Sequence, residues 1–171
     1  MIPPIFKTKR YIIGLYREKD ESRFLETALD DEVIKFMGGA NGDIKEEKDT
    51  FKRIFEVYEK EQVRWFWIWG VFEEDKLCAH IELKQSQHTV SNELEIVYMV
   101  HPAERRKGLM TEVLNIFKEN QYAWNKTIIA TVDHDNVCSI ALLEKWGIEK
   151  KEILFDEETG KEYLKCILSG A

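Results

Sequence analysis

The fold is decided by one stretch of the sequence, Val100-His-Pro-Ala-Glu-Arg-Arg-Lys-Gly-Leu-Met-Thr-Glu112. It ends a predicted strand, turns through three consecutive cations and Gly108, and then begins a helix. The free N–H groups at the start of a helix lie at the positive end of its dipole, and a glycine lets the backbone approach an anion closely. The segment therefore predicts a pyrophosphate site between a strand and a helix.

Other interpretations of this turn follow from spacing alone. A solvated basic turn beside a helix cap is an equally good interpretation, because one glycine is not a fingerprint. Neither GxGxxG nor GxxxxGK[ST] occurs in the chain, so a Rossmann or P-loop site is excluded. An anion bound here would belong to a different type of ligand.

Outward from this segment, the hydrophobic pattern predicts a mixed α+β fold in a single domain, residues 1–171. Aromatic and β-branched runs predict about seven strands, at 11–15, 65–72, 77–83, 94–100, 127–132, 148–155 and 162–168. Helical spacing predicts helices at about 20–29, 44–62, 109–122 and 136–146, with turns at Gly38-Gly39 and Thr159-Gly160. Hairpins combined with helices between strands imply a central twisted, mostly antiparallel sheet with helices on both faces.

Composition and charge exclude several classes of protein. The chain has 25 basic and 32 acidic residues, and this net charge of -7 would repel the phosphates of a nucleic acid. Its four histidines and its cysteines, Cys78, Cys138 and Cys166, lack the spacing of a metal site or a disulfide framework. The start lacks a signal peptide and no apolar run is long enough to span a bilayer. We therefore expect a cytoplasmic protein that binds no metal, nucleic acid or membrane.

A second informative segment is Asn136-Val-Cys-Ser139-Ile-Ala-Leu-Leu-Glu-Lys145-Trp-Gly147, in which a predicted helix begins and ends. Either Asn136 or Ser139 can cap the start of this helix, which stabilises it by roughly 1 kcal/mol. Capping is compatible with a further role in binding, so both interpretations stay open. Cys138 is a conceivable nucleophile, but a packing role is more typical of such a cysteine.

The two segments together resemble the GNAT superfamily of N-acetyltransferases. Arg105-Arg-Lys-Gly108-Leu-Met110 is similar to the acetyl-CoA signature [RQ]-x-x-G-x-[GA], with Met110 in place of the small residue. The segment from Asn136 is similar to N-x-x-S-x-x-x-L-E-K-x-G of the branch that acetylates ribosomal-protein N-termini. The likeness runs from about residue 8 to 168 and includes Thr8-Lys-Arg10, Glu95 and Tyr98.

This resemblance implies the GNAT acyl-CoA N-acyltransferase fold and direct transfer of an acetyl group from acetyl-CoA to a primary amine. It implies that Asn136 contacts the pantetheine arm and that Ser139, or a water, protonates the departing thiolate, since the tyrosine of many relatives is Leu143 here. A backbone N–H of Met99 or Val100, beside a β-bulge, is expected to stabilise the thioester oxygen. The expected cofactor-binding residues are Met99, Val100, His101, Arg105, Arg106, Lys107, Gly108, Leu109, Met110, Thr111, Asn136, Ser139 and Lys145.

The residues leave the general base open. An alkylamine with a pKa near 10 is neutral in only about one molecule in a thousand at pH 7, a cost of roughly 4 kcal/mol. Glu95, on the strand before the turn, is the first candidate and would act through water. An equally good interpretation makes Glu95 solvent-facing, because it alternates with apolar residues. The alternative bases are Glu93, His134, Glu157 and Glu158.

Two other functions remain as alternatives. A non-catalytic acyl-CoA-binding module would keep the predicted pyrophosphate site but would not catalyse acetyl transfer. Met110 and the missing tyrosine raise this alternative. The strand with Trp65, Phe66, Trp67 and Trp69 would suit a protein interface, although it is more typical of a buried sheet. The acceptor stays open between a protein N-terminus and a small-molecule amine, and the assembly between a monomer and a homodimer.

Overall fold

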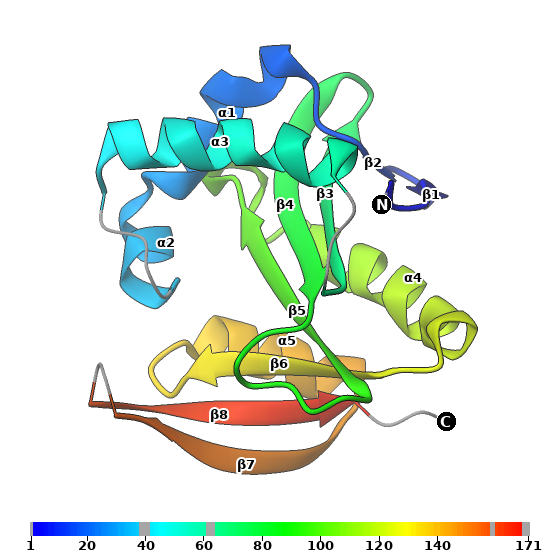
Figure 1. Ribbon diagram of the computed structural model, residues 1–171, viewed down its shortest axis with the longest axis vertical. Coiled ribbons are helices and arrows are strands. Elements are labelled where there is room, and N and C mark those ends of the chain that lie inside the picture. Colours follow the sequence, from blue (N-terminus) through cyan, green and yellow to red (C-terminus); the bar gives the residue numbers. More distant parts are fainter. Residues whose placement is uncertain (1, 38–41, 61–63, 158–159, 169–171) are drawn as a thin grey trace.

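A computed structural model describes residues 2–37, 42–60, 64–157 and 160–168, and in these residues one sheet is covered by helices (Figure 1). Gly38, Gly39, Glu158 and Thr159 lie outside the described residues. The elements in chain order are β1 (Phe6–Lys7), β2 (Ile12–Gly14), η1 (Glu18–Asp20), α1 (Glu21–Ala28), α2 (Asp31–Phe36), α3 (Ile44–Glu59), β3 (Phe66–Glu73), β4 (Lys76–Lys84), β5 (Glu93–Val100), η2 (Pro102–Glu104), α4 (Leu109–Trp124), β6 (Thr127–Asp133), α5 (Val137–Trp146), β7 (Ile148–Asp156) and β8 (Lys161–Leu168).

The sheet has eight strands in the order β1-β2-β3-β4-β5-β6-β8-β7. Its pairs are antiparallel except for β5 with β6, so the prediction of a mixed, mostly antiparallel sheet is confirmed. The additional strand is β1, in which Phe6 pairs with Ile13 of β2. The additional helix is α2, which begins where the Asp30 carboxylate accepts the amides of Glu32 and Val33. Both elements are too short to produce a recognisable period in the sequence.

Helices lie on both faces of the sheet, as predicted. In Figure 1, α3 crosses in front of β3 and β4, whereas α5 lies behind β6. One buried cluster joins α1, α2 and α3 to the sheet and includes Phe24, Phe51 and Met99. The other joins α4 and α5 to the opposite face and includes Leu114 and Leu143. We call these the α3 face and the α5 face. No helix among the described residues is long and apolar enough to cross a bilayer.

The aromatic strand β3 is a buried element and not an exposed interface. It lies between β2 and β4, where Trp69 is 0% exposed and Trp67 is 8% exposed. The indole N–H of Trp69 donates to the carbonyl of Pro4 at 2.8 Å, and its ring packs edge-on against Phe117 of α4. The aromatic residues of β3 therefore stabilise the packing of α4 on the sheet, and α4 begins at the predicted phosphate turn.

Candidate functional site

The predicted phosphate turn connects η2 to α4 in a conformation that suits an anion. Arg106 and Gly108 have φ angles of 60° and 74°, in the left-handed region. Left-handed residues in a turn direct successive amides into a concave surface, which binds anions. Gly108 adopts this conformation without strain, whereas Arg106 does so at some cost. The turn and the free amides at the start of α4 together provide N–H donors and a positive dipole end.

The three cations of this turn are not equivalent. Arg105 is half-buried and forms ion pairs with Asp30 and Glu32 at the start of α2. The ammonium of Lys107 donates to Glu104 at 2.8 Å. Arg106 is exposed, and it has no ion pair among the described residues. Arg106 is therefore the cation most available to a bound phosphate, a difference that the run of three cations does not reveal.

Arg10 holds the phosphate turn from the N-terminal segment. Its backbone N–H and its Nε donate to the carboxylate of Glu112 at 2.9 and 2.8 Å, and its Nη2 donates to the carbonyl of Lys107 at 3.1 Å. The amide and guanidinium of one residue thus tie the turn to the first turn of α4. These contacts give a structural role to Arg10 of the Thr8-Lys-Arg10 segment.

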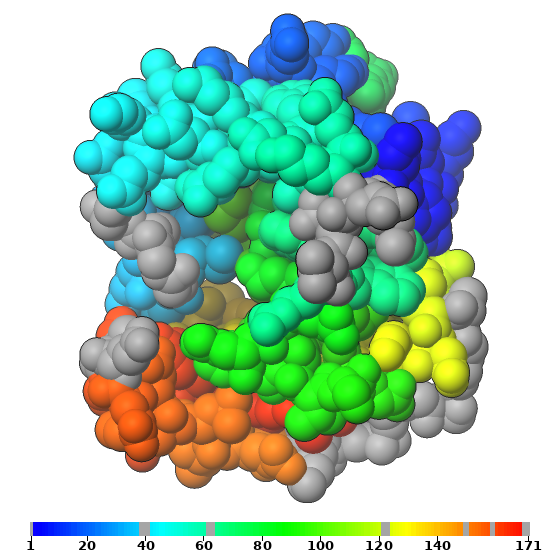
Figure 2. Space-filling model, viewed as in Figure 1, coloured from blue at the N-terminus to red at the C-terminus, as the bar shows by residue number. Residues whose placement is uncertain are grey.

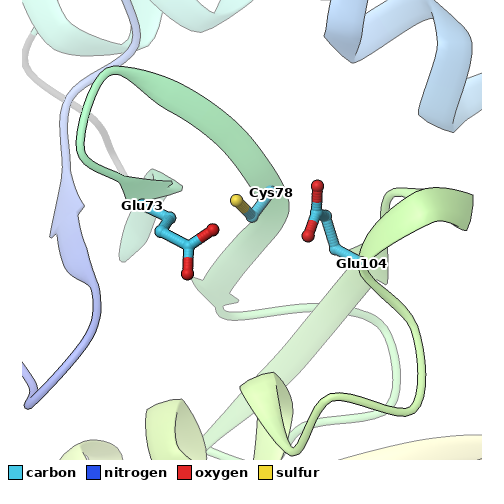
Figure 3. Close-up of side chains that lie close together, drawn as sticks. All are labelled: Glu73, Cys78 and Glu104. Carbon is cyan, nitrogen blue, oxygen red and sulfur yellow. The ribbon is translucent and has the colours of Figure 1, made fainter.

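A cluster of potential metal ligands lies on the other side of η2 (Figure 3). One ligand atom from each of Glu73, Cys78 and Glu104 lies within 4.8 Å of the others. The ammonium of Lys76, however, contacts the carboxylates of Glu104 and Glu73 at 3.0 and 3.1 Å, so a lysine supplies the positive charge there. Burial acts to raise the pKa of Glu104, but hydrogen bonds from Lys107 and Lys76 lower it below its usual value. The cluster ties η2 to the β3–β4 hairpin.

The sheet opens beside the phosphate turn. Strands β5 and β6 pair over Glu93–Glu95 and Thr127–Ile129, after which β5 continues along β4 while β6 continues along β8. Figure 1 shows the two strands diverging from this point. We call the gap between β5 and β6 beyond Glu95 the strand opening. It ends at the phosphate turn after β5 and at the start of α5 after β6, so both predicted motifs border it.

The predicted β-bulge is not the cause of this opening. The β4–β5 ladder keeps one register from Ala79 opposite Val100 to Lys84 opposite Glu95. The prediction of a bulge at Met99 or Val100 is therefore wrong. The strands separate because the pairing of β5 with β6 ends after Glu95, and a short parallel ladder leaves no signature in the local sequence.

The alternation of the β5 backbone decides which amide faces the strand opening. The N–H of His101 donates to Cys78 on the β4 side at 3.0 Å, whereas the carbonyl of Asn92 accepts from Thr127 on the β6 side at 2.9 Å. Main-chain groups of successive residues alternate between the two neighbouring strands, so the amide of Met99 faces β4 and that of Val100 faces the opening. Of the two predicted oxyanion donors, only Val100 is directed toward the opening.

The start of α5 borders the opening on the α5 face. The side chain of Asn136 caps the helix by accepting the amide of Ser139 at 3.1 Å, which confirms the capping interpretation. The hydroxyl of Ser139 forms a 2.7 Å hydrogen bond with the hydroxyl of Tyr98 on β5. Tyr98 is part of the resemblance, but no role in the site was predicted for it. The two residues are 41 positions apart, and only the topology brings them together.

Glu95 borders the opening on the opposite, α3 face. Successive side chains of a strand point to opposite faces, so Glu95 and Tyr98 lie on opposite sides of β5. Glu95 is 4% exposed, which makes the solvent-facing interpretation wrong. Its carboxylate accepts a hydrogen bond from Thr131 of β6, across the point where the two strands separate. A buried carboxylate therefore lies at the narrow end of the strand opening.

The alternative bases lie in other environments. The carboxylate of Glu93 accepts the ammonium of Lys165 at 2.6 Å, so that pair is internally neutralised. His134 is exposed in the connection between β6 and α5, and Glu157 is exposed after β7. Glu158 lies outside the described residues. Of these residues, Glu95 alone combines deep burial with a place at the end of the opening.

The remaining predicted cofactor residues lie in η2, at the start of α4 and near the end of α5. His101 is buried, accepts the amide of Ala103 at 3.2 Å and contacts Glu26 of α1 at 2.9 Å, so its ring holds η2 in place. Leu109 and Met110 are buried in the α5-face cluster, and Thr111 follows them in the first turn of α4. Lys145 is exposed near the end of α5, roughly 13 Å along the helix from Asn136 at 1.5 Å per residue. The structure does not bring Lys145 to the other predicted residues.

A chain of polar side chains runs along β4 on the α3 face. The hydroxyl of Tyr16 contacts Nδ1 of His80 at 2.8 Å, Nε2 of His80 contacts Glu82 at 3.2 Å, and Lys84 donates to Glu82 at 2.6 Å. Burial acts to raise the pKa of Glu82, but His80 and Lys84 outweigh it and lower this pKa to about 2. This row of hydrogen-bonded side chains was not predicted from the sequence. His80, Glu82 and Lys84 alternate with apolar residues, a pattern that resembles a solvent-facing strand.

The α3 face has a concave surface in front of these strands. Figure 2 shows this side of the molecule, hollowed between α3 and the β7–β8 hairpin, with atoms of the central strands at the bottom of the hollow. A second molecule can therefore approach the sheet from the α3 face, while the phosphate turn and α5 border the other side.

Comparisons with known proteins agree with this geometry. Residues 10–149 match the model of a family described as "Acetyltransferase (GNAT) domain". No curated protein matches the sequence significantly.

Solved structures show the same fold at low sequence identity. A GNAT-family acetyltransferase from Bacillus anthracis is 21% identical with a TM-score of 0.76, over 96% of this chain and 98% of that one. RimJ from Mycobacterium smegmatis, solved in complex with CoA-disulfide, is 15% identical with a TM-score of 0.77, over 96% and 86% of the two chains. Ribosomal-protein-S5-alanine acetyltransferase from Vibrio fischeri is 14% identical with a TM-score of 0.72, over 96% of each chain.

Proposed function

The chain belongs to the GNAT acetyltransferase family, and we propose that it transfers the acetyl group of acetyl-CoA to a primary amine in a ternary complex. The observation that supports this most directly is the placement of Glu95 and the Ser139–Tyr98 pair on opposite faces of β5, on either side of the strand opening. A thioester in that opening would have a carboxylate on the side open to an acceptor and a hydroxyl on the other.

The phosphate turn at one end of the opening suits the pyrophosphate of acetyl-CoA. The amides of the phosphate turn and the guanidinium of Arg106 would bind its pyrophosphate. The side chain of Met110 is 6% exposed and belongs to the core cluster, so it is directed away from the exposed surface of the turn. Acetyl-CoA supplies an activated acetyl thioester, and the rest of the chemistry depends on groups of this chain.

Each step of the proposed reaction has a candidate group. Glu95 accepts the proton of the ammonium, directly or through water, which leaves a neutral amine to attack the carbonyl carbon. The N–H of Val100 stabilises the negative charge that develops on the carbonyl oxygen, a contribution of roughly 3 to 4 kcal/mol for one well-placed donor. Ser139 donates a proton to the sulfur as the carbon–sulfur bond breaks.

The acceptor is best chosen among amines that are easily deprotonated. A peptide α-amine has a pKa of about 8, so roughly a tenth of it is neutral at pH 7, compared with about a thousandth of an alkylamine. The solved neighbours include an acetyltransferase from Salmonella typhimurium that modifies the N-terminal serine of the ribosomal protein L7/L12. We therefore propose a peptide or protein N-terminal amine as the first acceptor to test.

The proposal is tested in two stages. Calorimetric titration with acetyl-CoA should show micromolar binding that weakens when Arg105 and Arg106 are both replaced by Ala. Release of free thiol should then be measured with a peptide that has a free α-amine, with the same peptide N-terminally blocked, and with a polyamine. Turnover with the free peptide alone would support an N-terminal acceptor, and turnover with the polyamine alone would point to a small molecule. Binding of acetyl-CoA without turnover of either the free peptide or the polyamine would favour a non-catalytic module.

A further inference from the structure

The hydrogen bond between Tyr98 and Ser139 carries an inference about how the acid of the proposed reaction is oriented. Tyr98 is on β5 and Ser139 is the third residue of α5, and their oxygens are 2.7 Å apart. The hydroxyl of Tyr98 has no other hydrogen-bond partner in the part of the chain that the structure describes. Tyr98 is half-buried, and its phenol is a stronger acid and therefore a better hydrogen-bond donor than the hydroxyl of serine, so the oxygen of Ser139 is the acceptor.

This direction of donation determines where the proton of Ser139 points. When the oxygen of Ser139 accepts from Tyr98, its own hydrogen is free to turn toward a third group. The amide of Ser139 is meanwhile held by Asn136 at 3.1 Å, so both the backbone and the side chain of this residue are restrained. The strand opening lies next to this pair, because β6 pairs with β8 and leaves β5 beyond Glu95.

We propose that Tyr98 is a positioning residue, which donates to the oxygen of Ser139 and so directs the hydroxyl proton of Ser139 at the sulfur of the leaving thiolate. This inference rests on the proposed function. In the balanced step, the carbon–sulfur bond breaks, the sulfur takes the Ser139 proton as Ser139 takes the proton of Tyr98, and solvent returns a proton to Tyr98 after the products leave.

The environment of Tyr98 agrees with this role. Burial raises the pKa of Tyr98 to about 12, against the effect of its hydrogen bond with Ser139. The phenol therefore stays neutral, and remains a hydrogen-bond donor, over the whole pH range of an enzyme assay.

A double-mutant cycle tests the inference. Tyr98→Phe removes only the hydroxyl, and we expect kcat to fall about tenfold, with KM for acetyl-CoA unchanged, because one hydrogen bond is lost. Ser139→Ala should lower kcat by about a hundredfold. Since Tyr98 acts through Ser139, the double variant should be no slower than Ser139→Ala alone. A further tenfold loss in the double variant would overturn the inference, because it would show that Tyr98 acts independently of Ser139.

A matched control separates positioning from packing. Tyr58 is also half-buried, its pKa is also raised to about 12, and its hydroxyl donates to the carbonyl of Ile68 at 3.1 Å on the α3 face. Tyr58→Phe should lower stability as Tyr98→Phe does, but its effect on kcat should be the same with and without Ser139. Wild-type protein without turnover would contradict the proposed function, whereas normal turnover in Tyr98→Phe would contradict this inference alone.

Discussion

The two faces of β5 present different polar groups to the same strand opening. On the α3 face, the carboxyl group of Glu95 is buried and accepts a hydrogen bond from Thr131, as a buried polar group requires. On the α5 face, Tyr98 and Ser139 are neutral and satisfy each other. The comparison shows that one strand, through its alternation, presents a carboxyl group on one side and a pair of hydroxyl groups on the other, separated by the thickness of the sheet.

The largest effect is expected on the charged face. Glu95→Gln keeps the shape and the hydrogen bond from Thr131 but removes the basic group, so kcat with an amine acceptor should fall by about a thousandfold. The affinity for acetyl-CoA, measured by calorimetry, should not change. Glu157→Gln is the matched control, because Glu157 is exposed and was an alternative base. A large loss in Glu157→Gln with normal turnover in Glu95→Gln would transfer the role of base to the β7–β8 hairpin.

The phosphate turn should respond more weakly and shows a second contrast. Arg106→Ala should weaken acetyl-CoA binding by about tenfold, because it removes a charged hydrogen-bond donor, and it should leave the free energy of unfolding unchanged. Arg105→Ala should also lower the free energy of unfolding, by about 1 kcal/mol, because Asp30 and Glu32 lose their partner.

Calorimetry and urea unfolding of the two single variants separate these effects. If Arg105→Ala reduces binding more than Arg106→Ala does at equal stability, then Arg105 must leave its carboxylates to bind the phosphate. The assignment of Arg106 as the available cation would then be wrong.

The same contrasts show what the sequence could and could not predict. The seven longer strands, the four longer helices and the two motifs have strong local patterns, and their positions were predicted closely. The partners were not predictable, because Arg105 meets Asp30 across 75 positions and Tyr98 meets Ser139 across 41. Burial could not be decided in the same way: Glu95 and His80 alternate with apolar residues as in a solvent-facing strand, but α1 and α3 cover that face. These facts depend on the topology and not on a local period.

A smaller effect concerns stability on the α3 face and its dependence on pH. The pKa of Glu82 is about 2 in the folded protein, below its value of about 4.3 in an unfolded chain. A lowered folded-state pKa contributes stability above the unfolded value, and this contribution disappears as the pH falls toward 2. Glu82→Gln should therefore lower the free energy of unfolding by about 2 kcal/mol at pH 7 and by progressively less below pH 4.

Urea unfolding of wild type and Glu82→Gln at several pH values between 7 and 3 measures this difference. Glu157→Gln again provides an exposed control, which should match the wild type throughout. A difference between wild type and Glu82→Gln that stays constant down to pH 3 would show that the side chain acts through packing and not through its charge.

The smallest effect separates capping from binding on the α5 face. Asn136 caps α5 through its side-chain oxygen, a role that serine fills nearly as well, so Asn136→Ser should unfold within a few tenths of a kcal/mol of wild type. Asn136→Ala should lose about 1 kcal/mol. If the amide also contacts the pantetheine arm, both variants should bind acetyl-CoA severalfold more weakly in calorimetry. If only Asn136→Ala binds weakly, Asn136 acts by holding the start of α5, and with it Ser139, in place. That result would leave the α5 face with one polar pair, Ser139 and Tyr98, as its contribution to the site.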